Sequence, residues 1–380
     1  MLGFNKNSIF ALFILIGTIV GAGIFGFPYV VSKSGILPAL FYFVVLGGMM
    51  ILLHLFFGEI FLRTGEECRL VGLARKYLGK WYGRLTTFSV IFGTTGALLA
   101  YIILAGKFIS IMLSFKVDVD PVYCSLFFAL ALVPFIFKGT KLVARAEVLT
   151  NAVFFLIIFV IFIIGIPKIN LHNFSLISLP DILLPYGVVM FSLVGFSAIP
   201  EAEAILKGPD EKKNLKKIIL LTFGFIIAFY MLFTFVILGI SGKETSVDVF
   251  GGLIPFLGPE IIFFGALAAT ITVADSFLVV ALYLRNSLIH DQKFPKILAN
   301  SFVGFLPLIL FLLGFRSFIG VIGTLGTIIG VIEGIIIILL FKKAKELGDH
   351  QPEYTIKVPK FLLSVFMLIL ILGAVLQFIV

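Results

Sequence analysis

The stretch of sequence that decides the fold is an apolar segment interrupted by glycine, Gly17-Thr18-Ile19-Val20-Gly21-Ala22-Gly23-Ile24-Phe25-Gly26-Phe27-Pro28. A second apolar segment, in the other half of the chain, is interrupted at a corresponding place and reads Met190-Phe191-Ser192-Leu193-Val194-Gly195-Phe196-Ser197-Ala198-Ile199-Pro200-Glu201. A helix in lipid has no water to satisfy its backbone, so a break at mid-depth is tolerated only where it lines a cavity. Two such breaks indicate a carrier whose binding site lies between two structural repeats.

The composition is that of a membrane protein. Of the 380 residues, 61% are hydrophobic and 45 are phenylalanine, whereas only about half of a water-soluble globule is apolar. The net charge of +9 comes from cations in short loops between apolar runs, which is typical of topology control and not of a nucleic-acid-binding face. We expect no nucleic-acid partner. Cys68 and Cys124 are predicted near opposite sides of the membrane, so no disulfide is expected.

Apolar windows of about 20 residues predict eleven membrane-spanning helices. The first is too long for the apolar region of a signal peptide, so we expect it to stay in the membrane. The predicted spans are 8–31, 36–62, 85–114, 121–137, 146–166, 181–206, 218–240, 259–289, 297–313, 318–341 and 360–380.

The distribution of lysine and arginine predicts the orientation of these spans. With the spans alternating in direction, most of the 29 Lys and Arg residues fall on one side, which predicts a cytoplasmic N-terminus and an extracytoplasmic C-terminus in a plasma membrane of prokaryotic type. Spans 1 and 6 then enter from opposite sides. We therefore expect residues 1–170 and 171–345 to be two inverted five-helix repeats, and residues 346–380 to be a cytoplasmic loop and an eleventh helix.

The two breaks offer charges of both signs to a ligand. The outer half of span 1 begins with unpaired N–H groups that suit a carboxylate, and its inner half ends in carbonyls that suit a cation. Span 6 runs the other way, so its outer half ends in carbonyls around Phe191 to Leu193 that suit an ammonium group. Together these groups describe an α-amino acid. The alternative is that the glycines only allow close helix packing.

The motifs of the two breaks resemble a known family. Gly21-Ala22-Gly23-Ile24-Phe25 and Gly195-Phe196-Ser197-Ala198-Ile199-Pro200-Glu201 are similar to the amino acid–polyamine–organocation superfamily, and within it to the prokaryotic amino acid and aromatic amino acid permeases. The resemblance implies an all-α, leucine-transporter-type fold of five plus five inverted helices with one helix added. It also implies a permease that works by alternating access, and not an enzyme.

The binding pattern of that fold implies a set of substrate contacts in this chain. The carboxylate would meet the backbone of Ala22 and Gly23, and the ammonium group would meet carbonyls near both breaks. Aromatic and aliphatic side chains from spans 3, 6 and 8 would form the pocket wall. The complete predicted set is Thr18, Ile19, Ala22, Gly23, Tyr101, Phe191, Ser192, Leu193, Phe196 and Val280.

Span 8 contains a candidate site for the coupling ion. Thr272, Asp275 and Ser276 share one helix face, and an acid this deep in a membrane marks an ion or proton site. By resemblance to sodium-coupled members of the fold, carbonyls of Gly17 and Val20 would complete a Na⁺ shell. Asp275 as a proton carrier, or as a structural residue, remains open. The lysine that replaces sodium in some proton-coupled relatives is absent from span 5, which offers Asn151.

The remaining expectations concern function. Glu201 is a second candidate for a gate or proton carrier. We expect a symporter for a neutral, large apolar or aromatic amino acid, with Na⁺ or H⁺ as the coupling ion and no other cofactor. An exchanger or an amino acid-binding sensor is an alternative. A remote alternative is an intramembrane serine protease, because Gly195-Phe196-Ser197-Ala198 fits its short motif and His54 lies at depth. The oligomeric state stays open.

Overall fold

The computed structural model describes residues 4–64, 69–139, 143–290 and 292–379, and every regular element in these ranges is a helix. The first half of the chain forms two short helices, four long ones and an amphipathic helix between the second and third predicted spans. These are α1 (Lys6–Ile19), α2 (Gly23–Ser34), α3 (Ile36–Arg63), α4 (Leu70–Leu78), α5 (Lys80–Ser114), α6 (Pro121–Lys138) and α7 (Val143–Gly165), followed by the 3₁₀ turns η1 (Ile166–Lys168) and η2 (Leu171–Asn173).

The second half of the chain repeats the pattern of a short broken pair followed by long helices. Its elements are α8 (Leu184–Leu193), α9 (Ala198–Ile205), α10 (Gly208–Lys212), α11 (Leu215–Ser241), η3 (Gly242–Glu244), η4 (Gly251–Leu253), α12 (Ile254–Leu257), α13 (Pro259–His290), α14 (Lys296–Leu312), α15 (Phe318–Leu347) and α16 (Lys360–Ile379).

The predicted membrane-spanning segments are helices in the structure, as expected. Nine helices of the described chain are long and apolar enough to cross a membrane, with α8 and α9 together as one of them, and the bent pair of α1 and α2 raises this to ten. The helix at the ninth predicted span, α14, is apolar but has only 17 residues. The all-helical fold class is confirmed, whereas the count of eleven spans and the division into inverted repeats stay predictions.

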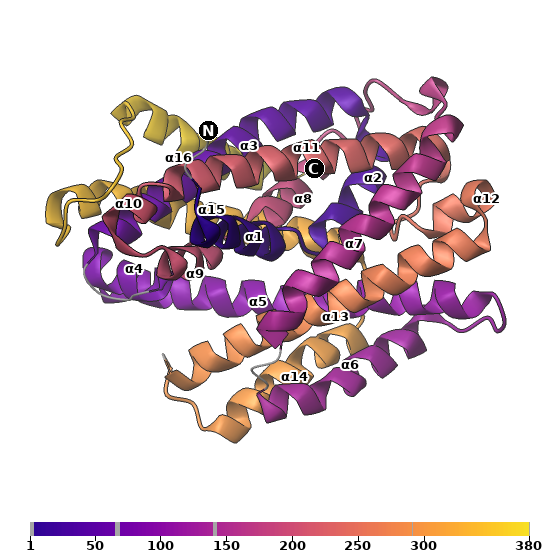
Figure 1. Cartoon of the computed structure of the whole chain (residues 1–380), viewed down its shortest axis with the longest axis horizontal. Coiled ribbons are helices and arrows are strands. Elements are labelled where there is room, and N and C mark those ends of the chain that lie inside the picture. Colours follow the sequence, from indigo (N-terminus) through magenta and orange to yellow (C-terminus); the bar gives the residue numbers. More distant parts are fainter. Residues whose placement is uncertain (1–3, 65–68, 140–142, 291, 380) are drawn as a thin grey trace.

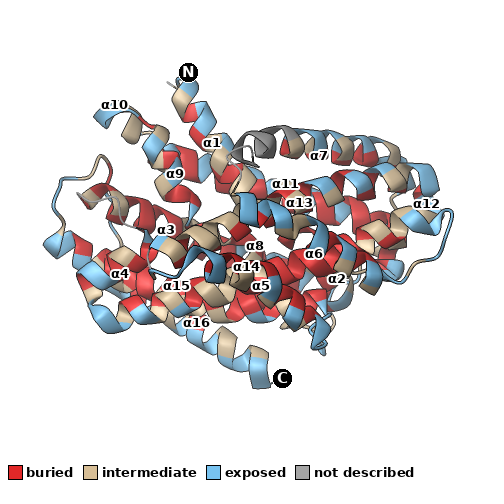
Figure 2. Cartoon of the chain, turned by 90° about the horizontal axis from the view of Figure 1, so that it is seen from below, coloured by how far each residue is buried: buried red, intermediate tan, exposed pale blue. Residues whose placement is uncertain are grey.

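The broken helices lie at the centre of the bundle. Figure 1 shows α1 between α11 on one side and α5 on the other, with α9 beside it, while α6, α13 and α14 lie together at one edge. The burial pattern agrees with this arrangement. Buried residues, in red, gather on α3, α5 and α15, while α16 shows exposed residues, in pale blue, along an outer edge (Figure 2). The exposed apolar residues of the outer helices include Phe41, Phe127, Phe159 and Phe361. Such faces suit a lipid solvent.

Close backbone contact between α8 and α15 fixes one of the broken helices in the bundle. A Cβ atom added at Gly187 would lie 2.1 Å from the Gly323 carbonyl oxygen, and one added at Gly326 would lie 1.8 Å from the Gly187 carbonyl oxygen and 2.5 Å from the Phe191 amide nitrogen. Lipid tails are as apolar as leucine, so helices in a membrane associate through such close packing of small residues. The glycines therefore hold α8 against α15 directly above the second break.

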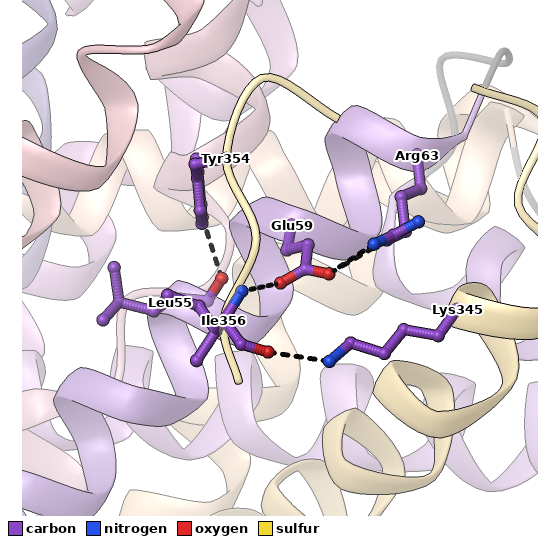
Figure 3. A network of polar contacts seen from close by, with 6 residues as sticks. All are labelled: Leu55, Glu59, Arg63, Lys345, Tyr354 and Ile356. Carbon is purple, nitrogen blue, oxygen red and sulfur yellow. Dashed lines mark hydrogen bonds and ion pairs between the residues drawn. The ribbon is translucent and has the colours of Figure 1, made fainter. Parts of the chain in front are cut away.

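The loop 348–359 folds back over the end of α3 (Figure 3). The fully buried Glu59 accepts hydrogen bonds from the Ile356 amide at 2.5 Å and from the Arg63 guanidinium at 2.8 Å. Tyr354 donates to a carbonyl of α3, and Lys345 donates to the Ile356 carbonyl at 2.7 Å. Glu59 thus pairs with Arg63, one turn further along α3, and the same carboxylate also ties the loop to α3. Of the two cysteines, Cys68 lies outside the described residues and Cys124 is a buried free thiol.

The packing of α8 on α15 yields a stability prediction. We expect Gly326→Ala to destabilise the protein by about 1–3 kcal/mol, because the added methyl group overpacks a backbone contact. The apparent melting temperature in detergent should fall. Gly48→Ala is the matched control, since no atom lies within 4 Å of a Cβ added to Gly48 in α3. Equal melting temperatures for the two variants would contradict the packing role.

Candidate functional site

The first break leaves backbone groups of both polarities without partners. The axes of α1 and α2 differ by 53°. The amide of Gly21 donates to the Ile19 carbonyl at 3.0 Å and not to the carbonyl four residues back. As a result, no backbone partner in the described chain reaches the carbonyls of Gly17 and Thr18 or the amides of Ala22 and Gly23. The positive and negative ends of two half-helices thus meet at one point.

The second break is made by a short extended stretch between α8 and α9. Val194 has φ −72° and ψ 129°, and its amide reaches back only to the Phe191 carbonyl at 3.4 Å. The helix resumes when the Ala198 amide bonds to the Gly195 carbonyl at 3.0 Å. The Leu193 carbonyl and the Phe196 amide consequently have no backbone partner within the described chain. Both predicted breaks are thus present as interruptions of the helical hydrogen-bond ladder.

The two breaks touch each other. A Cβ atom on Gly23 would lie 2.2 Å from the Ser192 hydroxyl oxygen, and one on Gly195 would lie 2.3 Å from the Ile19 side chain. The fully buried Tyr230 of α11 spans the junction, with its hydroxyl 3.3 Å from the Ile19 carbonyl oxygen and 3.3 Å from the Ser192 carbonyl oxygen. Sequence reasoning missed Tyr230, although a polar tip at the middle of an apolar span is a signal for such a role.

A cavity of about 190 Å³ opens between the breaks. Its walls include all the predicted substrate residues except Leu193, namely Thr18, Ile19, Ala22, Gly23, Tyr101, Phe191, Ser192, Phe196 and Val280. The side chain of Leu193 is fully buried and points toward Gly47 of α3. The structure thus brings the predicted set together around one space. Whether these residues bind substrate stays a prediction.

The cavity continues past the breaks toward α4, along residues of α5 and α15. Ala97, Gly93 and Ser89 follow one face of α5, and Leu325, Ile329 and Glu333 follow the facing side of α15. The cavity ends near Arg69, whose guanidinium lies 5.1 Å from the centre of the Tyr283 ring. These residues meet because α5 packs against α15, and neither helix carries a sequence motif that would predict this contact.

Carbonyls that were predicted to meet an ammonium group are already engaged in part. The Ile19 carbonyl accepts hydrogen bonds from Gly21 and Tyr230, and the Ser192 carbonyl accepts one from Tyr230. The Thr18 and Leu193 carbonyls have no backbone partner within the described chain. A cationic group therefore meets its strongest unused acceptors at Thr18 and Leu193, one from each break.

The candidate ion site is built on one face of α13. Asp275 is 8% exposed, and its carboxylate accepts a hydrogen bond from the Thr150 hydroxyl of α7 at 3.0 Å. The buried Thr272 hydroxyl has no hydrogen-bond partner, and Ser276 is half-buried on the same face. The side chain of Thr150 was not foreseen, because the prediction singled out its neighbour Asn151. In the described chain no three His, Cys, Asp or Glu side chains gather as for a transition metal, but hard cations bind carbonyl, hydroxyl and carboxylate oxygens.

The carbonyls assigned to the same ion site lie on α1. Gly17 has an unpaired carbonyl, as described above, and Val20 is the residue that ends α1. However, α1 packs mainly against α9 and α11, with a smaller contact to α7. The hydroxyl and carboxylate groups of α13 and the carbonyls of α1 are therefore not held together by close packing of their two helices.

Glu201 and His54 were the other two residues with a predicted role, and both lie close to the second break. Glu201 lies in the first turn of α9 and is exposed, beside the Glu203–Lys212 ion pair of 2.5 Å. His54 is fully buried, with Nδ1 2.8 Å from the Met50 carbonyl oxygen, and its ring stacks on Phe196 at 4.2 Å between centroids. The other ring nitrogen, Nε2, is buried and has no hydrogen-bond partner in the described chain, so the structure shows no nucleophile–base pair of His54 with a serine.

An all-helical bundle with two broken helices that meet around a central cavity defines a membrane transporter. The particular family follows from the sequence as a whole: residues 5–377 match the model of the tryptophan/tyrosine permease family, and the chain belongs to it. It is a multi-pass amino acid transporter and not an enzyme. None of the curated proteins matches the sequence.

A solved structure has the same fold. The crystal structure of MhsT in complex with L-phenylalanine matches with a TM-score of 0.64 over 99% of this chain and 98% of that chain. The two sequences are 15% identical. The match confirms the predicted leucine-transporter-type arrangement at the level of fold.

The position of Tyr230 yields a prediction about the junction of the breaks. We expect Tyr230→Phe to lower the apparent melting temperature in detergent, by the equivalent of about 1–2 kcal/mol for a lost buried hydrogen bond. We also expect weaker binding of labelled amino acid, because two carbonyls lose their common donor.

Tyr186→Phe is the control for this variant, because the buried Tyr186 hydroxyl donates to the Leu370 carbonyl at 3.1 Å, away from the cavity. It should reduce the melting temperature and leave binding unchanged. Equal affinities of Tyr230→Phe and Tyr186→Phe for the labelled amino acid would show that Tyr230 does not organise the site.

Proposed function

We propose that this permease is a secondary active transporter for a neutral, large apolar or aromatic amino acid, driven by Na⁺ or H⁺ through alternating access. The observation that carries the proposal is the junction of the two breaks, where unpaired amides and unpaired carbonyls face one cavity. Half-helix ends of opposite sign are suited to the carboxylate and ammonium groups of an amino acid.

The carboxylate and ammonium groups have distinct places in this proposal. The carboxylate binds the free amides of Ala22 and Gly23 at the start of α2, where the helix dipole is positive. The ammonium group binds the Thr18 and Leu193 carbonyls, whose helices end at the cavity. Gly23 is essential for this geometry, because a side chain there would collide with Ser192 and fill the approach to the amide.

The lining of the cavity favours an apolar side chain. Ala97, Val280, Leu325 and Ile329 form its walls together with the Phe196 ring. A pocket of this kind stabilises a large hydrophobic or aromatic group through burial, and a few polar groups fix the orientation of the ligand. The phenylalanine in the MhsT complex supports an aromatic substrate for a cavity of the same fold.

The coupling ion is proposed to bind at the α13 face. A sodium ion would draw its ligands from Asp275, the unpartnered Thr272 hydroxyl and Ser276, with α1 carbonyls added when α1 moves toward α13. A proton at Asp275 would use the same carboxylate without α1. The two mechanisms differ in whether sodium or pH sets the rate of uptake.

The open end of the cavity is proposed to face the cytoplasm. It ends at Arg69 and Leu70 beside α4, in the predicted loop that carries several cations, and such loops stay on the cytoplasmic side of a plasma membrane. With this orientation, the structure corresponds to an inward-facing state, in which substrate leaves along α5 and α15.

The experiment that tests the function is uptake into proteoliposomes of labelled tryptophan, phenylalanine and leucine. Each is measured under an imposed sodium gradient and, separately, under a proton gradient. Accumulation under one gradient supports a symporter and identifies the ion. Exchange without accumulation supports an exchanger, and binding without either process supports a sensor.

A substitution at the ion site separates coupling from transport. We expect Asp275→Asn to abolish gradient-driven accumulation, because the neutral amide holds neither a cation nor a transferable proton. Counterflow exchange of labelled substrate should remain. Asp181→Asn, which changes an acid outside α13 and outside the central cavity, should retain accumulation. Normal accumulation by Asp275→Asn would remove this residue from the coupling site.

A further inference from the structure

Three carboxylates of the described chain are buried, and they differ in their partners. Glu59 has Arg63 and the Ile356 amide, as Figure 3 shows. Asp275 has the Thr150 hydroxyl and belongs to the candidate ion site. Glu333, in the middle of α15, is 7% exposed and has no role in the mechanism described so far.

The Glu333 carboxylate has one neutral hydrogen-bond partner and borders the central cavity. Its Oε1 accepts a hydrogen bond from the Ser89 hydroxyl of α5 at 3.2 Å. No cation lies within ion-pair distance of it among the residues that the structure describes. Both Glu333 and Ser89 line the cavity that also contains the two breaks. The carboxyl group therefore contacts the same space that substrate and water enter.

Several charged groups on the surrounding helices have partners of their own. Glu59 and Arg63 of α3 pair with each other, and Nδ1 of His54 bonds within its helix. Arg69 lies over the Tyr283 ring at the far end of the cavity. Other engaged groups on elements packed against α15 are Lys33 over Tyr29, Lys76 with Asp349, Tyr77 with Thr64, Tyr186 with Leu370, and Lys345 with Ile356. Within the described chain, the remaining cations of these elements form no ion pair with Glu333, namely Arg75, Lys80, Arg84, Lys107 and Lys360.

The state of Glu333 must change when the cavity closes. While the cavity is open, water solvates an ionised carboxylate. Closure removes that water, and one serine hydroxyl is poor compensation for a charge left in a medium of low polarity. A neutral carboxylic acid at the same position keeps its hydrogen bond with Ser89 and carries no charge. Closure of the cavity thus favours the protonated form.

We propose that Glu333 is a proton-binding residue of the transport cycle, and that its carboxylate takes up one proton from cavity water before the cavity closes. The step is a simple protonation, in which hydronium gives its proton to a Glu333 oxygen and becomes water. Reopening of the cavity reverses it. This inference rests on the proposed transport function, and it holds whether Na⁺ or H⁺ binds at the α13 face.

Counterflow of labelled tryptophan across proteoliposomes, with equal pH on both sides, tests the proposal. The wild-type rate should fall at least several-fold as pH rises, because the ionised form resists closure. Glu333→Gln, which is neutral at every pH, should keep a rate near the wild-type acidic value throughout. Glu346→Gln is the matched control, since Glu346 lies on the same helix at the exposed end, and it should keep the wild-type profile.

A second variant tests the contact with Ser89. Ser89→Ala removes the hydroxyl that donates to the carboxylate among the described residues. The carboxylate should then take a proton more readily, and the pH profile of counterflow should move to higher pH. In the double variant Glu333→Gln with Ser89→Ala, the counterflow rate should not change with pH. An unchanged pH profile in Glu333→Gln would overturn the proposal.

An infrared readout separates failure of this inference from failure of the transport function. One component of the C=O stretch of protonated carboxylic acids should disappear from the wild-type spectrum as pH rises. That component should be missing from Glu333→Gln and present in Glu346→Gln, whatever band Asp275 contributes. A lack of counterflow in the wild-type protein contradicts the transport function. A carboxylic acid band identical in Glu333→Gln and wild type contradicts the proton site, whatever the transport result.

Discussion

The constraint on which the structure depends is the need to satisfy backbone hydrogen bonds inside a bilayer. The other described spans are continuous helices, and at the breaks of α1–α2 and α8–α9 several backbone groups have no backbone partner. Those groups lie against each other and against a cavity, where a ligand or water replaces the missing partners. The contact of Gly23 with Ser192 and the double approach of Tyr230 keep the two breaks at the same depth.

This arrangement separates recognition from energy coupling. In the proposed binding mode, the backbone holds the amino and carboxyl groups that all amino acids share, and residues of α5, α13 and α15 contact the substrate side chain. The ionisable groups lie apart from both, with Asp275 against α7 and Glu333 against α5. In this proposal the broken helices bind the substrate backbone, whereas specificity and coupling use different positions of α13 and α15.

Much of the fold and part of the site could be predicted from the sequence, for physical reasons. The length of the apolar segments predicted the spans, and the glycine clusters predicted the breaks. The position of Asp275 in the middle of an apolar span marked it as unusual. Pairings between distant helices were not predictable, because periodicity reports which face a residue occupies and not which helix meets it. Thr150, Tyr230 and the Ser89–Glu333 pair were missed for this reason. Leu193 was predicted to act through its carbonyl, which has no backbone partner in the described chain, while its side chain packs toward α3.

The shortness of α14 affects the membrane around the protein. Its 17 residues extend about 25 Å, less than a typical hydrocarbon thickness of about 30 Å. The helix lies at an edge of the bundle and exposes apolar residues such as Phe305 and Ile309 to lipid. With α14 as the predicted ninth span, the bilayer beside it would become thinner to match it, at a modest cost that grows with bilayer thickness. The permease should thus favour thin membranes, and lipid chain length becomes a regulator of its stability on that side.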